Sequence, residues 1–438
     1  MSADQKSAAK RVTSNKLARE KIDHLVRDAV FGADDIKESS RRQILESAIQ
    51  EGIFPASIES LYEARGERLY SDMTVPAINI RGITYDVARA IFKAAMQHCV
   101  GAFIFEIARS EIGYTGQRPG EYAACVLAAG IREGFRGSVF LQGDHFQFSR
   151  SRYQSDPKGE MESVRSLVRE AVNAMFFNID IDASTLVDIG KPSLDQQQED
   201  NCRVMAEMTR FIRSIEPKGL TISVGGEIGE VGKKNSTVEE LQAFMSGYLS
   251  RLGPGIKGIS KISVQTGTTH GGVVLPDGSI AHVEIDFKAL KDLSIMARDE
   301  YGMAGAVQHG ASTLSEEAFD MFPEVGCAEI HLATAFQNII YDSPYFPQEL
   351  RDKINQRLRE KYSGERSKGD TDEQFIYKTR KKAFGDFKKE LWDLPEDILR
   401  KIGETIQERF ALLFKKLNVV NTAELVNRYV ANQYLPKV

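Results

Sequence analysis

The chain has 438 residues, of which 42% are hydrophobic and 27% are charged, and these proportions are ordinary for a soluble globular protein. The formal net charge of −5 gives no electrostatic reason to expect nucleic acid or an anionic membrane as a partner. No apolar run approaches the roughly 18–20 residues of a transmembrane helix, and the N-terminus lacks the apolar region of a signal peptide.

The cysteines indicate a reducing compartment. Cys99, Cys125, Cys202 and Cys327 lie far apart, and none belongs to a CxxC pair. This spacing favours buried free thiols over a disulfide framework or a cysteine-zinc site, so we expect a cytoplasmic chain.

Residues 1–70 are rich in charge and have apolar side chains at helical spacing, as at Leu17, Ile22, Leu25, Val26 and Ala29. The segment shows no strand signal. We therefore predict an N-terminal helical extension over residues 1–70.

From about residue 72 short β-rich runs alternate with amphipathic helical stretches. The eight expected strands are Val75–Ile80, Ala102–Ile107, Ser138–Leu141, Phe176–Ile181, Leu220–Val224, Gly258–Val264, Ala304–Gln308 and Ala328–Leu332. Such alternation predicts a parallel sheet, and eight strand-helix units over about 270 residues suit a closed (β/α)8 barrel, here over residues 71–345. The alternative is a doubly wound open sheet, but Asn79-Ile80-Arg81-Gly82 is not the glycine-rich dinucleotide turn GxGxxG.

Residues 346–438 contain no strand signal and form a predicted C-terminal helical extension. A polar loop is expected over residues 362–375. After it, apolar side chains recur at helical spacing at Phe384, Phe387, Leu391, Leu399, Ile402, Ile406, Phe410 and Leu413. We expect this segment to cover barrel helices or to make a subunit contact rather than to form a separate binding module.

Histidines and one glutamate fall at the ends of expected strands. His145 follows the third strand, Glu227 the fifth, His270 the sixth and His309 the seventh, while His331 lies in the eighth. The carboxyl ends of barrel strands meet at one mouth, where barrel active sites lie. Three imidazoles at that mouth suit a catalytic Zn²⁺, whereas any one of them alone is more often a structural, hydrogen-bonded residue.

Small residues and arginines add an anion signal. Gly310-Ala311-Ser312-Thr313 follows the seventh strand, with Ser312 or Thr313 as the expected N-cap of a helix. Either a phosphate site or a plain capping box explains it. Four arginines follow strands one to three and suggest an anionic substrate: Arg81, Arg109, Arg150 and Arg152.

Six motifs in order resemble those of the class II, zinc-dependent fructose- and tagatose-bisphosphate aldolases. They are Pro76-Ala77-Ile78-Asn79, Gly143-Asp144-His145, Ile181-Asp182-Ala183-Ser184, Gly226-Glu227-Ile228-Gly229, Gly267-Thr268-Thr269-His270-Gly271 and His309-Gly310-Ala311-Ser312. The segment Gly113-Tyr114-Thr115-Gly116, the long chain and the helical C-terminal tail also resemble the accessory, Z-type subunit of tagatose-bisphosphate aldolase.

The resemblance implies roles for particular residues. His145, His270 and His309 would be zinc ligands, and Asp144 would be the general acid/base at the C4 hydroxyl. Glu227, with Asp182 as a second candidate, would hold the metal in a resting position. The substrate and its phosphate would contact Asn79, Gly271, Gly310, Ser312 and Thr334. Zinc would stabilise an enediolate as a Lewis acid, while a carboxylate moves one proton.

The chain also departs from the family pattern. Val273-Val274 stands where the family usually has lysine, His331-Leu332-Ala333 replaces Asn-Ile-Asp, and Ala108 stands in place of a common serine. These changes affect groups that hold the substrate. A phosphorylated or otherwise anionic ketose other than fructose 1,6-bisphosphate is therefore expected.

Two other functions remain open at this point. One is a non-catalytic accessory subunit that stabilises an aldolase partner, and the other is a zinc hydrolase in which Asp144 activates water. As partners we expect a small phosphorylated sugar and further subunits, either copies of this chain or another aldolase subunit. The ligand types leave Co²⁺ and Mn²⁺ open beside Zn²⁺.

Overall fold

The computed structural model describes residues 21–229, 234–267, 275 and 284–430. Within these residues eight parallel strands close into a barrel, because β4 pairs with β3 on one edge and with β5 on the other. The barrel strands are β2 (Val75–Asn79), β3 (Ile104–Ala108), β4 (Gly137–Gln147), β5 (Asn178–Asp182), β6 (Ser223–Glu227), β7 (Lys261–Val264), β8 (Ala306–Gln308) and β9 (Glu329–Leu332). Each overlaps one expected strand, so the prediction of a (β/α)8 barrel is confirmed.

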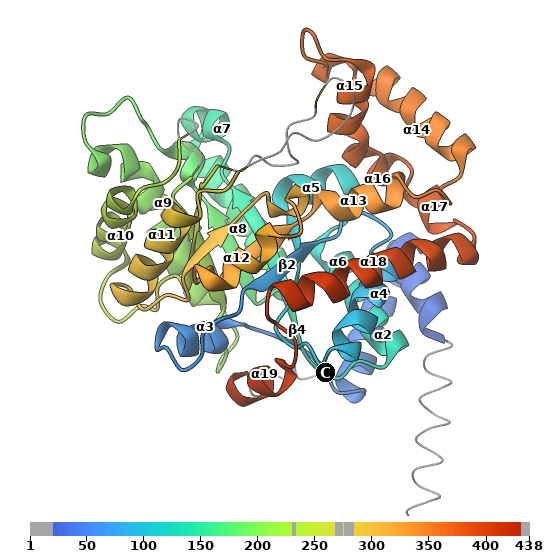
Figure 1. Cartoon of the computed structure of the whole chain (residues 1–438), viewed down its shortest axis with the longest axis horizontal. Helices are drawn as coiled ribbons and strands as arrows, with labels where there is room; N and C mark the ends of the chain where they lie inside the picture. The colour runs from blue at the N-terminus through green and yellow to red at the C-terminus, as the bar shows by residue number, and fades with distance from the viewer. Residues whose placement is uncertain (1–20, 230–233, 268–274, 276–283, 431–438) are drawn as a thin grey trace, which may run out of the picture.

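Helices follow every barrel strand and surround the sheet (Figure 1). They are α4 (Thr84–Gln97), α5 (Arg109–Thr115), α6 (Pro119–Glu133), α7 (Arg150–Ser155), α8 (Pro157–Asn173), α9 (Leu194–Ile215), α10 (Val238–Leu252), α11 (Phe287–Asp299), α12 (Ala318–Glu324) and α13 (Thr334–Tyr341). Helix α8 shows why they form: Asp156 caps its first turn, and Met161, Val164 and Val168 bury one face at helical spacing.

The N-terminal segment corrects the expectation of helices alone. Between α2 (Asp34–Gln50) and α3 (Glu59–Gly66) lies a short strand, β1 (Ile53–Ala56), which pairs in parallel with the start of β4. The side chain of Asn178 at the start of β5 donates to Ala56 O and accepts from the Ile58 N–H. The segment therefore closes the amino-terminal end of the barrel.

The C-terminal segment is helical, with α14 (Gln348–Lys361), α15 (Asp372–Thr379), α16 (Ala383–Asp386), α17 (Lys388–Trp392), α18 (Glu396–Lys416) and α19 (Ala423–Tyr429). Helix α15 begins inside the expected polar loop. Figure 1 shows α14 and α15 standing out to one side of the barrel, while α18 lies over α4. The predicted apolar positions Ile402, Ile406, Phe410 and Leu413 form the buried face of α18.

The four cysteines are free thiols, and all except Cys99 are buried. Among the helices that the structure describes, none combines the length and the apolar character that a bilayer crossing requires.

Candidate active site

A cavity of about 950 Å³ opens at the carboxyl ends of the barrel strands. Most of the predicted site residues line it: Asn79, Asp144, His145, Glu227, His309, Gly310, Ser312 and Thr334. The four predicted arginines, Arg81, Arg109, Arg150 and Arg152, line it as well. His270 and Gly271 lie outside the residues that the structure describes. The side chains that were expected at the strand ends therefore lie together around one cavity.

Asp144 and His145 lie within β4, not after it as expected, because the strand runs on to Gln147. The pairing with β5 shifts register between Gly143 and Phe146, which marks a β-bulge. At the bulge the backbone of His145 has a φ of 40°, in the left-handed region that is uncommon for residues other than glycine. Such strain persists where the surroundings hold it, and it is often found at functional sites.

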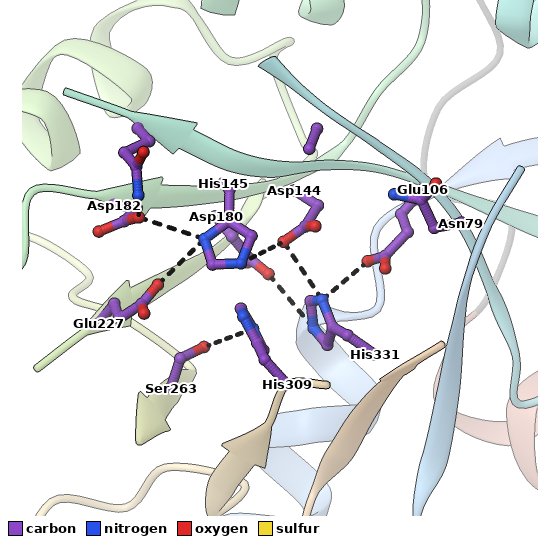
Figure 2. Close-up of polar contacts among 12 residues, drawn as sticks. Asn79, Glu106, Asp144, His145, Asp180, Asp182, Glu227, Ser263, His309 and His331 are labelled. Atoms are coloured by element: carbon purple, nitrogen blue, oxygen red, sulfur yellow. Dashed lines mark hydrogen bonds and ion pairs between the residues drawn. The ribbon is translucent and has the colours of Figure 1, made fainter. Parts of the chain in front are cut away.

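Carboxylates hold the ring of His145 on one side (Figure 2). Its Nδ1 lies 3.2 Å from Asp182 Oδ2 and 3.2 Å from Glu227 Oε2. Asp182 is fixed in turn by the N–H and the hydroxyl of Ser184. A carboxylate at one ring nitrogen orients the imidazole, as in many histidine-metal sites, and Nε2 on the other side lies 4.0 Å from Asp144 Oδ1.

His309 stands between the two other imidazoles. Its ring centroid lies 4.2 Å from that of His145 and 4.1 Å from that of His331. Its Nε2 lies 3.2 Å from the hydroxyl of Ser263. Three groups of possible metal ligands share members, and within each group the ligand atoms lie within 4.8 Å of one another. The groups are His145, Glu227 and His309; Asp144, His309 and His331; and Glu106, Glu329 and His331.

The donors of the first group suit a divalent metal. Two imidazole nitrogens and one carboxylate oxygen are ligands that Zn²⁺ takes, and ligand atoms around a tetrahedral Zn²⁺ lie about 3.3 Å apart. Small shifts of side chains whose ligand atoms lie within 4.8 Å of one another would bring them to that spacing. The residues present fit the metal that the sequence predicted.

His331 contacts three buried carboxylates, which the sequence did not indicate. Its Nδ1 lies 3.1 Å from Glu106 Oε2 and 3.2 Å from Asp144 Oδ1 (Figure 2). Its Nε2 lies 2.7 Å from Glu329 Oε1. Asp144 is 5% exposed and faces the cavity. The residue that replaces the family's strand-eight asparagine therefore touches the predicted general acid/base.

A charged network fills the barrel below this site. Lys261, 1% exposed, pairs with Asp180 at 2.9 Å and with Glu329 at 2.5 Å, and donates to Gln142 Oε1 at 2.7 Å. The hydroxyl of Tyr62 in α3 donates to Glu329 from the amino-terminal end. Barrel interiors are usually filled by apolar layers, so this network was not expected. Its signal in the sequence is a charged residue between apolar ones, as in Phe105-Glu106-Ile107.

The pKa values of the buried groups follow from this crowding. Burial alone would lower the pKa of His145, but Asp144, Glu227 and Asp182 outweigh it and raise the pKa well above its ordinary value. Glu106 and Asp144 do the same to the pKa of His331. Burial would raise the pKa of Glu329, but Lys261 and His331 hold it at about 2.

The predicted phosphate loop has a different backbone from the expected helix start. Gly310 has a φ of 70°, which glycine adopts without strain, and Ala311–Thr313 form one 3-10 turn. Leu314 is extended and separates this turn from α12, so the expected N-cap at Ser312 or Thr313 was wrong. The hydroxyl of Ser312 instead accepts from the Ala335 N–H at 3.4 Å, in the first turn of α13.

Carboxylates partly balance the arginines around the cavity. Arg81 pairs with Glu111 at 2.7 Å and reaches Thr334 Oγ1 at 3.5 Å. Arg109 pairs with Glu160 at 2.6 Å. These two arginines of the cavity are therefore held in place by ion pairs within the protein.

The fold and the site define a (β/α)8-barrel protein with a candidate metal centre at the carboxyl ends of its strands. The chain belongs to the class-II fructose-bisphosphate aldolase family, whose model matches residues 67–421. The resemblance noted in the sequence is thereby confirmed. Among curated protein sequences, none matches the chain.

Solved structures show the same fold at low identity. The YdjI aldolase from Escherichia coli K12 is 14% identical, with a TM-score of 0.50 over 84% of this chain and 99% of that chain. Fructose-bisphosphate aldolase from Campylobacter jejuni is 18% identical, with a TM-score of 0.51 over 84% and 96%. Fructuronate-tagaturonate epimerase UxaE from Cohnella laeviribosi is 11% identical, with a TM-score of 0.53 over 80% of each chain. At these identities the likeness concerns the fold alone.

Proposed function

We propose that the protein is a metal-dependent aldolase that cleaves and forms an anionic, phosphorylated ketose. One observation carries the proposal: Asp144 and the group His145, Glu227 and His309 line one cavity at the mouth of a barrel of this family. Aldol chemistry needs a group that moves a proton beside a centre that stabilises negative charge on oxygen.

His145, Glu227 and His309 are the described residues that would hold the metal, with His270 as a further ligand proposed from the sequence. When bound, the metal supplies Lewis-acid stabilisation of the charge that develops on the ketone oxygen. Asp182 holds His145 through Nδ1 and so orients the ring for binding.

Asp144 is the proposed general acid/base. Its carboxylate is buried at the cavity wall, where little water competes for the proton of a substrate hydroxyl. His331 holds it through the contact of 3.2 Å and fixes its direction. A carboxylate in this place can take the hydroxyl proton in cleavage and return it in condensation.

The substrate is proposed to be anionic because Arg81, Arg109, Arg150 and Arg152 line the cavity. Gly310, Ser312 and Thr334 line the same cavity and are proposed to contact a phosphate. Asn79 also lines the cavity and is proposed to contact the substrate, with its side chain held by the hydrogen bond that its amide donates to Glu111.

The test combines metal analysis with a retro-aldol assay on a panel of ketose phosphates. We expect wild type to hold one divalent metal per chain and to cleave one of the substrates. His309→Ala is expected to lose both metal and activity. His24→Ala, at an exposed histidine far along the chain from the site, is the matched control and should keep both.

The contact between His331 and Asp144 also favours a second candidate, a non-catalytic accessory subunit, since it departs from the family pattern at the reacting carboxylate. A protein that binds no metal, cleaves no substrate and raises the activity of an aldolase partner would establish that function instead.

A further inference from the structure

One cation in the cavity comes from the C-terminal segment rather than from the barrel. Lys381 lies in the 3-10 turn η5 (Arg380–Lys382) and lines the cavity together with the barrel residues. Its neighbours are both paired, Arg380 with Asp342 at 2.7 Å and Lys382 with Glu365. Within the described part of the chain no ion pair joins Lys381 to a carboxylate, and its Nζ lies 5.9 Å from the ring centroid of Tyr114.

Close packing fixes the segment that carries Lys381. Helix α16 follows it directly and lies beside α5 (Figure 1). A Cβ at Gly385 would lie 2.0 Å from Tyr114 O, and a Cβ at Gly82 would lie 2.0 Å from the Phe384 ring. Only glycine permits these approaches, so the turn is held against the barrel mouth.

This packing gives a role to Gly113-Tyr114-Thr115-Gly116, a motif that the proposed reaction leaves unused. Gly385 packs closely against the backbone of Tyr114, and the carbonyl of Gly116 accepts a hydrogen bond from Lys388 Nζ at 3.2 Å. The motif is a docking surface for the C-terminal segment. It brings that segment to the cavity.

The charges around Lys381 do not balance. Arg81 lines the same cavity and takes Glu111 as its partner. The carboxylate of Glu111 also accepts from the amide of Asn79 and from the Ala108 N–H, so it is already fully engaged. Burial, and then the charge of Arg81, lower the pKa of Lys381.

We propose that Lys381 and Arg81 bind an anionic group of the substrate, a phosphate or a carboxylate, so that the C-terminal segment completes the substrate site. Two cations against one carboxylate in a partly buried wall leave a positive charge that an anion neutralises. The identity of the ligand as a ketose rests on the proposed function, whereas anion binding at Lys381 does not.

The first experiment is an isothermal titration of the full chain with inorganic phosphate. We expect Lys381→Gln and Lys381→Met to lose one phosphate equivalent or to bind it at least about tenfold more weakly, since a charge-assisted hydrogen bond is lost. Lys381→Arg should restore binding. Lys382→Gln, which changes the neighbouring lysine that pairs outward with Glu365, is the matched control and should bind as wild type does.

Thermal unfolding in phosphate-free buffer separates binding from a structural role. Removing an unpaired, half-buried cation next to Arg81 should leave the melting temperature of Lys381→Met unchanged or higher. A neutral variant that binds phosphate as wild type does overturns the proposal, and so does a Lys381→Met protein that unfolds at a lower temperature in phosphate-free buffer.

Kinetics then identify the anion. Lys381→Gln should raise KM at least about tenfold, with kcat nearly unchanged, for ketoses that carry the recognised group. Two sets of substrates are compared: ketose bisphosphates, and ketose phosphates that end in a carboxylate. The set whose KM rises more in Lys381→Gln shows whether Lys381 recognises a phosphate or a carboxylate. If wild type cleaves neither, the proposed aldolase function fails, while the phosphate titration still decides the role of Lys381.

Discussion

Asp144 Oδ1 lies 3.2 Å from His331 Nδ1, and this contact joins the proposed general acid/base to the charged interior of the barrel. The same imidazole contacts Glu106 and Glu329, and Glu329 contacts Lys261. The carboxylate at the cavity is therefore held by a chain of buried charges that reaches toward the amino-terminal end of the barrel. Such networks are rigid when every member has a partner and costly when one is removed.

The substitution His331→Asn should destabilise the protein through this network. It removes a cation that faces Glu106, Asp144 and Glu329, and leaving buried carboxylates uncompensated costs about 3–5 kcal/mol. Urea denaturation at neutral pH measures the free energy of unfolding. Adding Glu106→Gln should recover part of the loss, because one carboxylate then needs no cation. Equal stability of His331→Asn and wild type would contradict the network's role.

The substitution Asp144→Asn should separate chemistry from metal binding. The amide keeps the shape of the side chain but cannot take up a proton, so kcat should fall about 10²–10⁴-fold. His145, Glu227 and His309 are unchanged, so the metal content should stay at the wild-type level. Assay and metal analysis of one preparation provide the measurement. Loss of metal together with activity would instead assign Asp144 to the ligand set.

Glu59 should make stability depend on pH. It is 2% exposed, and burial raises its pKa to about 7 from an ordinary value of 4.5. The folded chain therefore keeps a proton that the unfolded chain releases, and wild type loses stability as the pH rises from about 4.5 to 7. Glu59→Gln removes this loss, so its advantage over wild type should grow across that window to about 3 kcal/mol at most.

Chemical denaturation of both proteins at a series of pH values measures this difference. Glu63→Gln is the matched control, because Glu63 lies on the same helix and pairs with the same Lys257 but is half exposed. Its stability relative to wild type should change little with pH. A constant difference between Glu59→Gln and wild type from pH 4 to pH 8 would show that Glu59 does not titrate as argued.

Much of the fold followed from the periodicity of the sequence, because most barrel strands overlap short β-rich runs between amphipathic helices. Helix α10 occupies Val238–Leu252, where apolar spacing and the capping residue Thr237 both mark it. Strand β1 could not be predicted in this way, since its four residues include Pro55 and gain their strand character only by pairing with β4. The 3-10 turn at Ala311–Thr313 was also missed, since local capping signals do not report tertiary packing.

The position of the site could be predicted from the sequence, but the contacts between its side chains could not. Strand order alone brings Asp144, His145, Glu227 and His309 to one mouth, because parallel strands in a barrel end on the same side. The contacts of His331 with Glu106 and Glu329 depend on which side chains face inward, and that needs the register of β3 against β9 through the barrel. Lys381 was beyond prediction, because 236 residues separate it from His145 and only the docking of α16 on α5 brings it to the cavity.

The substitution Gly385→Ala tests that docking. Its Cβ would lie 2.0 Å from Tyr114 O, a backbone atom that cannot move aside as a flexible side chain would. We expect a loss of about 1–3 kcal/mol in the free energy of unfolding from overpacking, together with weaker phosphate binding, since Lys381 moves away from Arg81. Gly364→Ala is the matched control, because a Cβ there meets nothing within 4 Å and the residue lies in the same C-terminal segment.

Limited proteolysis of the two variants reports where the packing is lost, and faster cleavage between α15 and α17 is expected for Gly385→Ala alone. Wild-type phosphate binding in a Gly385→Ala protein whose C-terminal segment is cleaved faster would show that the segment does not serve the site.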